Sequence, residues 1–433
     1  MSGLDADDRA LLERRRKVLG GAYRLFYDQP LHPQRGEGVW LYDRHDRAYL
    51  DAYNNVACLG HCHPQVVAAI SRQAARLNTH TRYLDETILD CAERLLATLP
   101  PPLAQVIFTC TGSEANDLAY RIACQYTGAR GLIVTRMAYH GVTQALAQAS
   151  PSLGAQVPLG RHVRTVELPG AGDRDGLSPA QRFAAQVQRA VDELAAAGIR
   201  PAALLLDSVF ASDGIFTDPA GFIAPAVEVI HRAGGLFIAD EVQAGLARLG
   251  EPFWGFVRHR VSPDIVTLGK PFGNGHPVAA VVARRECMEA FGQASRYFNT
   301  FGGNPVSCAA ALAVLDVIER EGIPGRVEEV GEYLRRGLGQ LAALHPEIGQ
   351  VRGAGLFIAV AFASNSVRSA AAIARAVVEG MRERGVLLSL TGAGGDVLKI
   401  RPPLVFERQH ADILIERLDQ TLTALRAGPT AET

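Results

Sequence analysis

The sequence predicts an α/β protein in which a large domain with a mainly parallel sheet is joined to a smaller α+β domain. The chain has 433 residues, too many for one small core, so we expect two domains. From about residue 61 to 305, short apolar runs alternate with helical patterns, which is typical of parallel strands connected by helices. Several of these runs are apolar at every position, as strands buried on both faces are.

The order of the expected elements divides the chain into three parts. Near the start, the acids after Asp5 and the basic residues at 14–17 complement a helix dipole, so a helix is predicted there. Strands of the large domain are expected at 105–108, 131–134, 203–206, 235–240, 264–270 and 278–282. After a helix around 309–315, runs at 355–360, 386–388 and 397–400 predict strands of the smaller domain. The predicted parts are a segment 1–60 that packs with the small domain, a large domain 61–305, and a C-terminal small domain 306–433.

The composition excludes several classes of protein. A formal net charge of -1 gives no reason to expect nucleic acid or an acidic membrane surface as a partner. No apolar stretch is long enough to span a bilayer, and the acidic N-terminus differs from a signal or transit peptide. The 7 cysteines are odd in number and include no C-x-x-C pair, which suits a reducing compartment. We therefore expect a cytoplasmic protein.

One segment has the composition of a metal site. Cys58, His61, Cys62 and His63 lie close together in the sequence. Alternate residues on a turn point apart, however, and a closed zinc site needs four converging ligands. No second ligand pair stands nearby, so we expect no metal.

Asp240 and Lys270 each stand at the end of a predicted buried strand. In sheets of parallel strands, ligands gather at the carboxyl ends of the strands. An acid and an amine in this place suit pyridoxal phosphate, which is held by a lysine Schiff base with a carboxylate on its pyridinium nitrogen. An ion pair that caps two strand ends would explain the two residues equally well, so other motifs must decide.

Further motifs follow neighbouring strands. The residues TCTGSEAND at 109–117 open a helix, where free backbone N–H groups and the helix dipole suit a phosphate. An ordinary serine N-cap would look the same. Tyr139 would stack on a flat ring or fill the core, and Val242 and Gln243 would place an apolar residue and an amide beside that ring. Thr300, in the loop 299–305, carries a hydroxyl that suits a phosphate.

In this order, the motifs TGSEAN, YHG, DEVQ, LGK and NTFGGNP resemble those of the class III aminotransferase family. The resemblance covers about residues 20 to 425 and implies the type I fold of pyridoxal-phosphate enzymes, with a large seven-stranded sheet. It implies a homodimer with active sites at the interface, which could pair into a tetramer. The implied site residues are Lys270 as the Schiff-base lysine, Asp240 on the ring nitrogen, Gly112 and Ser113 on the phosphate, Tyr139 and Val242 on the two ring faces, Gln243 on the ring oxygen, and Thr300 on the phosphate of the neighbouring subunit.

Two departures from the family pattern bear on the substrate. Members that use 2-oxoglutarate have an arginine in the late strand and a glutamate in a loop that resembles EPVQGEGG. Here Ser212 stands where the glutamate would be, and Lys399 stands where the arginine is expected. Lysine lacks the planar fork that recognises a carboxylate, but it binds phosphate well as a point charge. A small slip in the alignment would put Arg401 in the same place, and strand alternation gives both residues the same face.

Segments at 53–57, 77–84, 269–277 and 297–300 resemble the ethanolamine-phosphate and phosphohydroxylysine phospho-lyases. This implies an enzyme that acts on O-phosphoethanolamine or another phosphorylated amino alcohol and releases phosphate, ammonia and an aldehyde. Candidates for binding the substrate phosphate are Lys399, Arg82 and Arg401, each of which could instead form a salt bridge or a solvated face. The alternative is a class III ω-aminotransferase that moves an amino group from a terminal amine to pyruvate or another 2-oxo acid. A non-catalytic protein would have lost Lys270 or Asp240, so we expect an enzyme.

Overall fold

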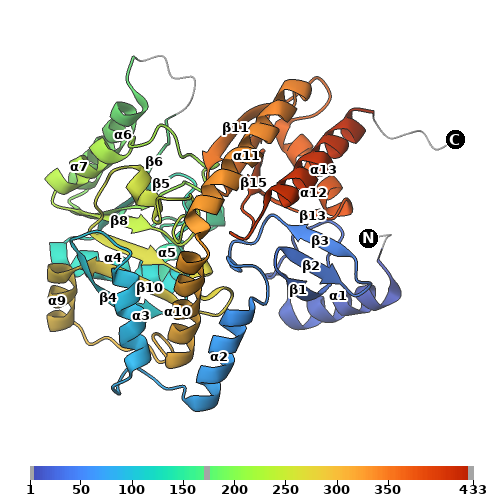
Figure 1. The fold of residues 1–433 in the computed structure, drawn as a ribbon. Helices are drawn as coiled ribbons and strands as arrows, with labels where there is room; N and C mark the ends of the chain where they lie inside the picture. The colour runs from blue at the N-terminus through green and yellow to red at the C-terminus, as the bar shows by residue number, and fades with distance from the viewer. Residues whose placement is uncertain (1–3, 170–175, 428–433) are drawn as a thin grey trace.

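A computed structural model describes residues 4–169 and 176–427 (Figure 1). The large sheet and its helices lie on one side of the molecule, and two smaller sheets with their helices lie on the other. The helices are α1 (Ala6–Leu19), α2 (Pro64–Arg76), α3 (Glu86–Leu96), α4 (Gly112–Thr127), α5 (Gln144–Ala147), α6 (Pro179–Ala196), α7 (Ala224–Arg232), α8 (Gly255–Arg258), α9 (Arg285–Ala294), α10 (Pro305–Arg320), α11 (Ile323–Leu344), α12 (Ala370–Glu383) and α13 (Arg408–Ala427), with short 3-10 helices at Pro151–Leu153 and Lys270–Gly273.

The large sheet has seven strands in the order β4-β10-β9-β8-β7-β5-β6. Neighbouring strands from β9 to β6 are parallel, whereas β10 runs antiparallel to both of its neighbours. The predicted mainly parallel sheet is therefore confirmed. The strands are β4 (Leu103–Thr109), β5 (Gly131–Thr135), β6 (Val163–Val166), β7 (Pro201–Asp207), β8 (Leu236–Asp240), β9 (Ile265–Leu268) and β10 (Ala279–Arg284).

Successive residues of a central strand point to opposite faces of this sheet. In β7, Leu204 packs in the core on one face and Leu205 in the core on the other. Leu118 of α4 belongs to the same core as Leu205, so α4 covers that face. Every residue of β5, β8 and β9 is buried. Charged side chains that serve chemistry are therefore confined to the ends of these strands.

Two four-stranded sheets form the rest of the molecule. One, in the order β11-β12-β15-β14, is antiparallel and is covered by α11 and α12, and α13 packs against these two helices. The other joins three N-terminal strands to β13, which pairs in parallel with β3. The strands are β1 (Pro33–Glu37), β2 (Trp40–Asp43), β3 (Ala48–Asp51), β11 (Ile348–Ala354), β12 (Phe357–Phe362), β13 (Val386–Leu387), β14 (Ser389–Thr391) and β15 (Val397–Ile400).

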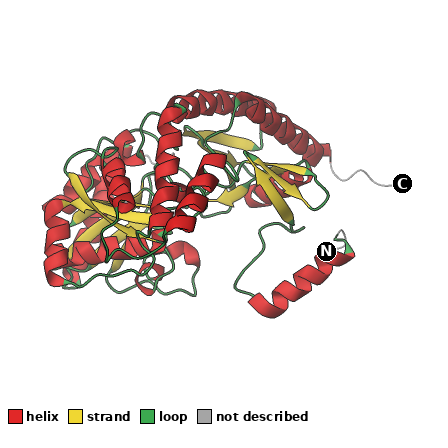
Figure 2. Ribbon diagram, turned by 60° about the horizontal axis from the view of Figure 1, so that its bottom comes forward, coloured by secondary structure: helices red, strands yellow, loops and turns green. Residues whose placement is uncertain are grey.

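The N-terminal part therefore shares a sheet with a strand from the C-terminal part. The boundaries at residues 60 and 305 stay a prediction. The run at 386–388, expected as one strand, forms β13 at Val386–Leu387, and after Leu388 the chain enters β14 of the other four-stranded sheet. The N-terminal helix forms as expected, and the Asp5 side chain caps it by accepting a hydrogen bond from the backbone N–H of Asp8 at 2.9 Å. Figure 2 shows this helix at the edge of the molecule, where Arg44 donates a hydrogen bond to Asp7 Oδ2 at 2.7 Å; none of its residues is buried.

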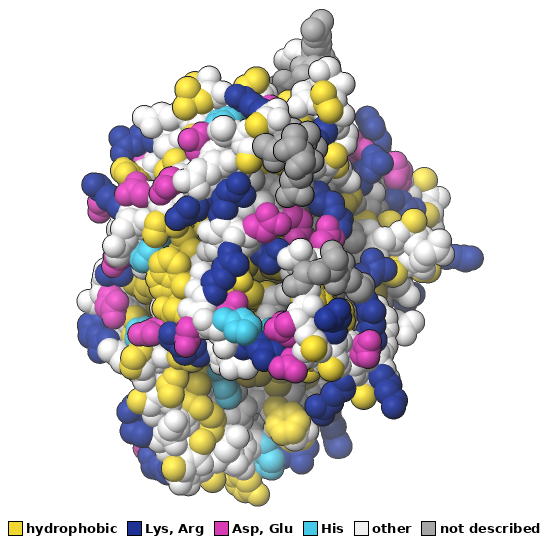
Figure 3. Space-filling view, turned by 90° about the vertical axis from the view of Figure 1, so that its right-hand side faces the viewer, with side chains coloured by type: hydrophobic (Ala, Val, Ile, Leu, Met, Phe, Trp, Pro, Cys, Tyr) yellow, Lys and Arg dark blue, Asp and Glu magenta, His cyan; other side chains and the backbone are white. Residues whose placement is uncertain are grey.

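The surface charge and the helices of the described residues bear on the expected partners, and the absence of a nucleic-acid or membrane partner stays a prediction. On the face that Figure 3 shows, Lys and Arg side chains lie among those of Asp and Glu, and neither sign dominates. Within residues 4–169 and 176–427, no helix is both long and apolar enough to span a bilayer. In the same ranges no three His, Cys, Asp or Glu side chains form a group that could hold a metal ion. The cytoplasmic location and the absence of a metal stay predictions.

Candidate active site

Asp240 is the last residue of β8, and its buried carboxylate has three partners. Oδ2 accepts a hydrogen bond from Asn116 Nδ2 at 2.8 Å and lies 2.7 Å from His140 Nδ1. Oδ1 accepts a hydrogen bond from the backbone N–H of Val242 at 3.1 Å. Since an ionised carboxylate only accepts hydrogen bonds, the proton of the His140 ring lies on Nδ1. These partners compensate the cost of burying the charge and hold the carboxylate in one orientation.

The partners of Asp240 are themselves held by a network that sequence reasoning missed. Asn116, on α4, also donates from Nδ2 to the carbonyl of His140 at 2.9 Å. Its Oδ1 accepts from Thr267 Oγ1 at 2.6 Å, and Thr267 lies opposite Asp240 in the pairing of β8 with β9. Asn116 stands in the TGSEAN motif and His140 in YHG, so the motifs contained the signal. The network therefore holds the Asp240 carboxylate against both the sheet and α4.

Lys270 follows β9 and opens the short 3-10 helix Lys270–Gly273. Burial lowers the pKa of its amine, and the nearby charge of Arg401 lowers it further. Asp240 and Asp207 act in the opposite direction, so both carboxylates lie within electrostatic range of Lys270. An amine with a lowered pKa is neutral more often at physiological pH, which suits a nucleophile or a general base.

The N-terminus of α4 has the features of a phosphate site. A capping box uses the Thr111 and Glu114 side chains, and Glu114 Oε2 accepts from the backbone N–H of Cys110 at 2.8 Å and of Thr111 at 2.9 Å. The backbone N–H groups of Gly112 and Ser113 have no partner among the described residues. Free N–H groups at the positive end of a helix dipole bind anions.

Close approaches between glycines and neighbouring residues show that the predicted motifs meet. A Cβ on Gly112 would lie 2.9 Å from Val242 Cγ1, and a Cβ on Gly141 would lie 2.8 Å from the Cα of Ser113. A Cβ on Gly269 would lie 3.3 Å from the backbone nitrogen of Gly112. TGSEAN, YHG, DEVQ and LGK therefore converge on one place. A carboxylate for a ring nitrogen, a lysine amine and an anion-binding helix end stand together there, so the residues fit pyridoxal phosphate.

Two predicted cofactor residues lie at the rim rather than in the interior. Tyr139 keeps 38% of its surface exposed. Thr300 is exposed, in the loop between α9 and α10. The fifth motif thus reaches the surface beside the site.

The predicted substrate residues fall into two groups. Lys399 lies in β15 between Ala359 and Ser389 of the neighbouring strands and is only 8% exposed. Its ammonium has no hydrogen bond or ion pair to any described residue. Burial lowers the pKa of Lys399 to about 7, with further lowering by Arg401 and Lys270 and an opposing effect of Asp207.

Arg401 is also buried, and one of its N–H groups donates a hydrogen bond to Gln243 Oε1. Arg82, by contrast, is exposed, with its guanidinium carbon 3.9 Å from the centre of the Phe298 ring. Ser212 is partly buried, and its carbonyl accepts from the backbone N–H of Gly392 at 3.3 Å. Lys399 and Arg401 are therefore the two candidates that lie within electrostatic range of Lys270.

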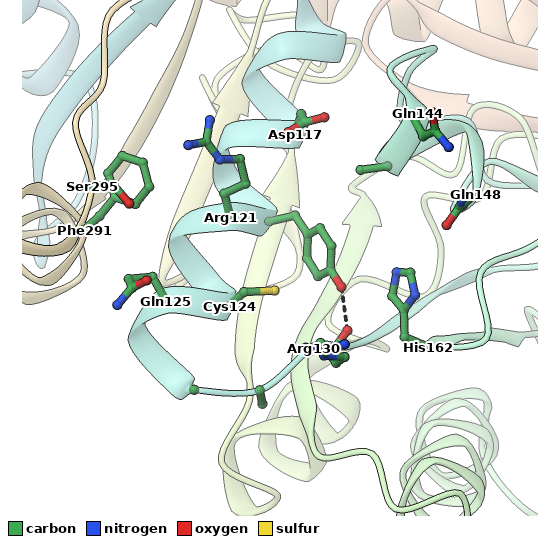
Figure 4. A pocket seen from close by; sticks show the side chains of 14 residues that line it. Asp117, Arg121, Cys124, Gln125, Arg130, Gln144, Gln148, His162, Phe291 and Ser295 are labelled. Atoms are coloured by element: carbon green, nitrogen blue, oxygen red, sulfur yellow. Dashed lines mark hydrogen bonds between the residues drawn. The ribbon is translucent and has the colours of Figure 1, made fainter.

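A separate hollow of about 860 Å³ lies on the outer side of α4 (Figure 4). Asp117, Arg121 and Cys124 of α4 line it, together with His162 and other side chains. It contains none of the predicted site residues. The inner side of the same helix carries Asn116, so the convergent motifs and this hollow lie on opposite sides of α4.

Comparisons with known proteins agree with this geometry. The family model for class III aminotransferases matches residues 26–422. A Drosophila melanogaster protein named alanine–glyoxylate aminotransferase 2-like is 38% identical over 429 residues, which are 96% of this chain and 87% of that protein. A Caenorhabditis elegans protein named ethanolamine-phosphate phospho-lyase homolog 1 is 35% identical over 442 residues, 96% of this chain and 93% of that protein.

Among solved structures, an Arthrobacter phospholyase in complex with phosphoethanolamine superimposes with a TM-score of 0.92 at 42% identity. The match covers 96% of this chain and 99% of the Arthrobacter chain. A transaminase solved with L-alanine gives a TM-score of 0.85 at 25% identity and covers 92% of this chain. The predicted fold, the enzymatic nature of the protein and its pyridoxal phosphate cofactor are thereby confirmed. The chain belongs to the class III aminotransferase family.

Proposed function

We propose that the protein is a phospho-lyase that acts on a phosphorylated primary amine, with O-phosphoethanolamine as the preferred substrate. With the uptake of one molecule of water, the products are inorganic phosphate, ammonia and acetaldehyde. The observation that carries the proposal is Lys399, a buried cation that has no partner within the described part of the chain. Lys17, Lys270 and Lys399 are the three lysines of the chain, against 44 lysines and arginines together. Arginine is therefore the usual basic residue of this chain, and the lysine at position 399 is an exception.

The proposed cofactor contacts follow from the geometry and the resemblance. Asp240 keeps the ring nitrogen protonated, and Lys270 holds the aldehyde carbon. Pyridoxal phosphate then supplies an electron sink for the negative charge left when a proton leaves the carbon next to the substrate nitrogen. The remaining proposed contacts are Gly112 and Ser113 on the phosphate, Tyr139 and Val242 on the ring faces, Gln243 on the ring oxygen and Thr300 of a second copy on the phosphate.

Lys270 is the proposed base. With the substrate held at the cofactor, the Lys270 amine would take up the proton from the carbon next to the substrate nitrogen. Its lowered pKa supports this role, because a larger share of the amine is unprotonated at neutral pH. The phosphate group then leaves from the adjacent carbon, and no 2-oxo acid takes part.

Lys399 is the proposed partner of the substrate phosphate. In the free protein its pKa of about 7 reflects the cost of burying an unpaired charge. A phosphate dianion would provide the missing partner and favour the protonated lysine. Arg401 stands in the same electrostatic neighbourhood and Arg82 at the surface, and both stay candidates for a secondary contact. The phosphoethanolamine bound to the similar Arthrobacter phospholyase supports this class of substrate.

A second candidate function is an ω-aminotransferase that passes the amino group of a terminal amine to pyruvate or another 2-oxo acid. The similarity to the Drosophila protein named alanine–glyoxylate aminotransferase 2-like favours it. The same cofactor residues would serve both reactions. Lys399 and Ser212 would then determine the choice of acceptor.

We also propose that the active protein is a homodimer, since the resemblance to the family places Thr300 on the cofactor phosphate of a neighbouring copy. Tyr83, Leu84 and Phe301 are exposed apolar residues of the segments around Thr300. Tyr83, Leu84 and Phe298 line a groove of about 390 Å³. Contiguous exposed apolar surface of this kind marks an interface. A second copy is the occupant that the role of Thr300 requires.

The test of the proposed reaction uses the purified protein with pyridoxal phosphate and O-phosphoethanolamine, without any 2-oxo acid. Catalytic release of inorganic phosphate together with acetaldehyde is the expected result, with Lys270→Ala as the inactive control. Absence of release, combined with repeated turnovers of a terminal amine once pyruvate is added, would replace the lyase by the aminotransferase.

A further inference from the structure

Gln243 and Arg401 make a contact that the proposed reaction does not use. Arg401 Nη1 donates a hydrogen bond to Gln243 Oε1, and the two side chains are only 8% and 9% exposed. Gln243 follows β8 in the large sheet, and Arg401 follows β15 in a different sheet. The contact therefore joins the cofactor motif DEVQ to the strand that carries Lys399.

This contact determines the orientation of the Gln243 amide. A guanidinium group has five N–H donors and no acceptor. The amide atom that faces it must therefore be the carbonyl oxygen, and the NH2 group must point the other way. Nε2 of Gln243 has no hydrogen-bond partner within residues 4–169 and 176–427, so this donor is free for a ligand.

Arg401 is itself held firmly from the N-terminal part of the chain. Its backbone N–H donates to the carbonyl of Ala52 at 2.9 Å, and its guanidinium carbon lies 4.9 Å from the centre of the Tyr53 ring. The loop after β3 is fixed in turn, because Asp51 Oδ1 accepts from the backbone N–H of Tyr53 at 3.0 Å and of Asn54 at 2.8 Å. A cation held by an aromatic face and a backbone contact in this way has little freedom to turn toward a substrate.

We propose that Arg401 is a positioning residue that fixes the Gln243 amide with its NH2 group toward the phenolic oxygen of pyridoxal phosphate. That oxygen lies on the ring carbon beside the one that bears the aldehyde group, and as an anion it needs a donor. A reversed amide would present a carbonyl oxygen to it and repel it. The proposal concerns the cofactor alone and does not depend on which reaction the enzyme catalyses.

The test measures the absorbance of bound pyridoxal phosphate as a function of pH in the substrate-free enzyme. The midpoint reports the pKa of the nitrogen atom that joins Lys270 to the cofactor. A hydrogen-bond donor to the phenolic oxygen makes protonation of this nitrogen less favourable. Arg401→Met should raise the midpoint by about one pH unit, the equivalent of one hydrogen bond. Arg401→Lys, which keeps a cationic donor, should stay close to the wild type.

A double-mutant cycle separates positioning from simple charge. Gln243→Leu should raise the midpoint as much as Arg401→Met does, and the double variant should show no further rise. Additive shifts would mean that Arg401 acts through its charge alone, and the proposal would be wrong. A wild-type midpoint in Gln243→Leu would overturn the proposal as well. Because this variant retains Arg401, it tests the proposal even if Arg401→Met is insoluble. An unchanged midpoint with a raised KM in Arg401→Met would make Arg401 a substrate contact instead.

Discussion

Replacement of Lys399 by methionine is the sharpest test of how the substrate is recognised. Methionine has an unbranched apolar side chain of similar length to that of lysine, but it lacks the cationic ammonium group. A hydrogen bond to a charged group contributes about 1.5–3 kcal/mol. Because Lys399 is only 8% exposed, solvent screening reduces this contribution little. At 1.4 kcal/mol per tenfold, we expect the KM for O-phosphoethanolamine to rise by roughly 10- to 150-fold.

The pH dependence of the KM for O-phosphoethanolamine is a second, independent measure of the role of Lys399. The pKa of Lys399 is about 7 in the free protein, and a bound phosphate dianion would raise it. Above pH 7 the free enzyme loses the proton that the complex retains. The KM of the wild type should therefore increase up to tenfold per pH unit above about pH 7, whereas that of Lys399→Met should be nearly flat there. The second pKa of a phosphate monoester, about 6, lies below this window.

The assay is phosphate release at a series of substrate concentrations between pH 6.5 and 9. Lys17→Met is the matched control, since it removes the exposed lysine of α1 and should leave KM unchanged. The affinity for pyridoxal phosphate should also be unchanged in Lys399→Met. Equal KM values for Lys399→Met and the wild type across this range would remove Lys399 from the substrate site.

Four further predictions concern the cofactor site and the assembly. Lys270→Ala should still bind pyridoxal phosphate but lose measurable turnover, as seen by equilibrium dialysis and phosphate release. Asp240→Asn removes the charge but keeps the shape, and kcat should fall by roughly 10²–10⁴-fold in steady-state assays. Gly112→Ala places a methyl group 2.9 Å from Val242 and should weaken cofactor binding about tenfold, whereas Gly339→Ala, with no atom within 4 Å of its added Cβ, should not change the measured Kd. Leu84→Asp should shift sedimentation from dimer to monomer and lower cofactor affinity; an unshifted dimer would contradict the proposed interface.

The sequence predicts the centre of the molecule better than its edges, for a physical reason. Strands such as β8 are buried on both faces, so their apolar runs are plain in the sequence. β11 was not predicted, because Ile348–Ala354 mixes exposed polar residues and glycines with few buried ones. β14 was not predicted, because the run expected at 386–388 covers only β13, and apolar residues do not reveal where a chain leaves one sheet for another.

The same contrast holds for the candidate site. Four of the five motifs meet in the structure because each follows a strand whose end is fixed by the sheet, whereas NTFGGNP lies in the loop between α9 and α10. The hydrogen bonds of Asp240 to Asn116 and His140 join residues that are 124 and 100 positions apart, a pairing that no local pattern contains. Sequence alternation gave Lys399 and Arg401 the same face and could not separate them. Their surroundings separate them, since Arg401 donates a hydrogen bond to Gln243 and Lys399 has no hydrogen-bond partner among the described residues.

The pairing of β3 with β13 has a consequence for how the chain is made. Leu50 stands opposite Val386, and its backbone N–H donates to the carbonyl of Gly385 at 2.8 Å. During synthesis the first three strands leave the ribosome early, yet one edge of their sheet stays unpaired until residues near 387 have emerged. An exposed strand edge invites pairing with other chains. We therefore expect the N-terminal strands to stay open to wrong pairing through most of the synthesis of the chain.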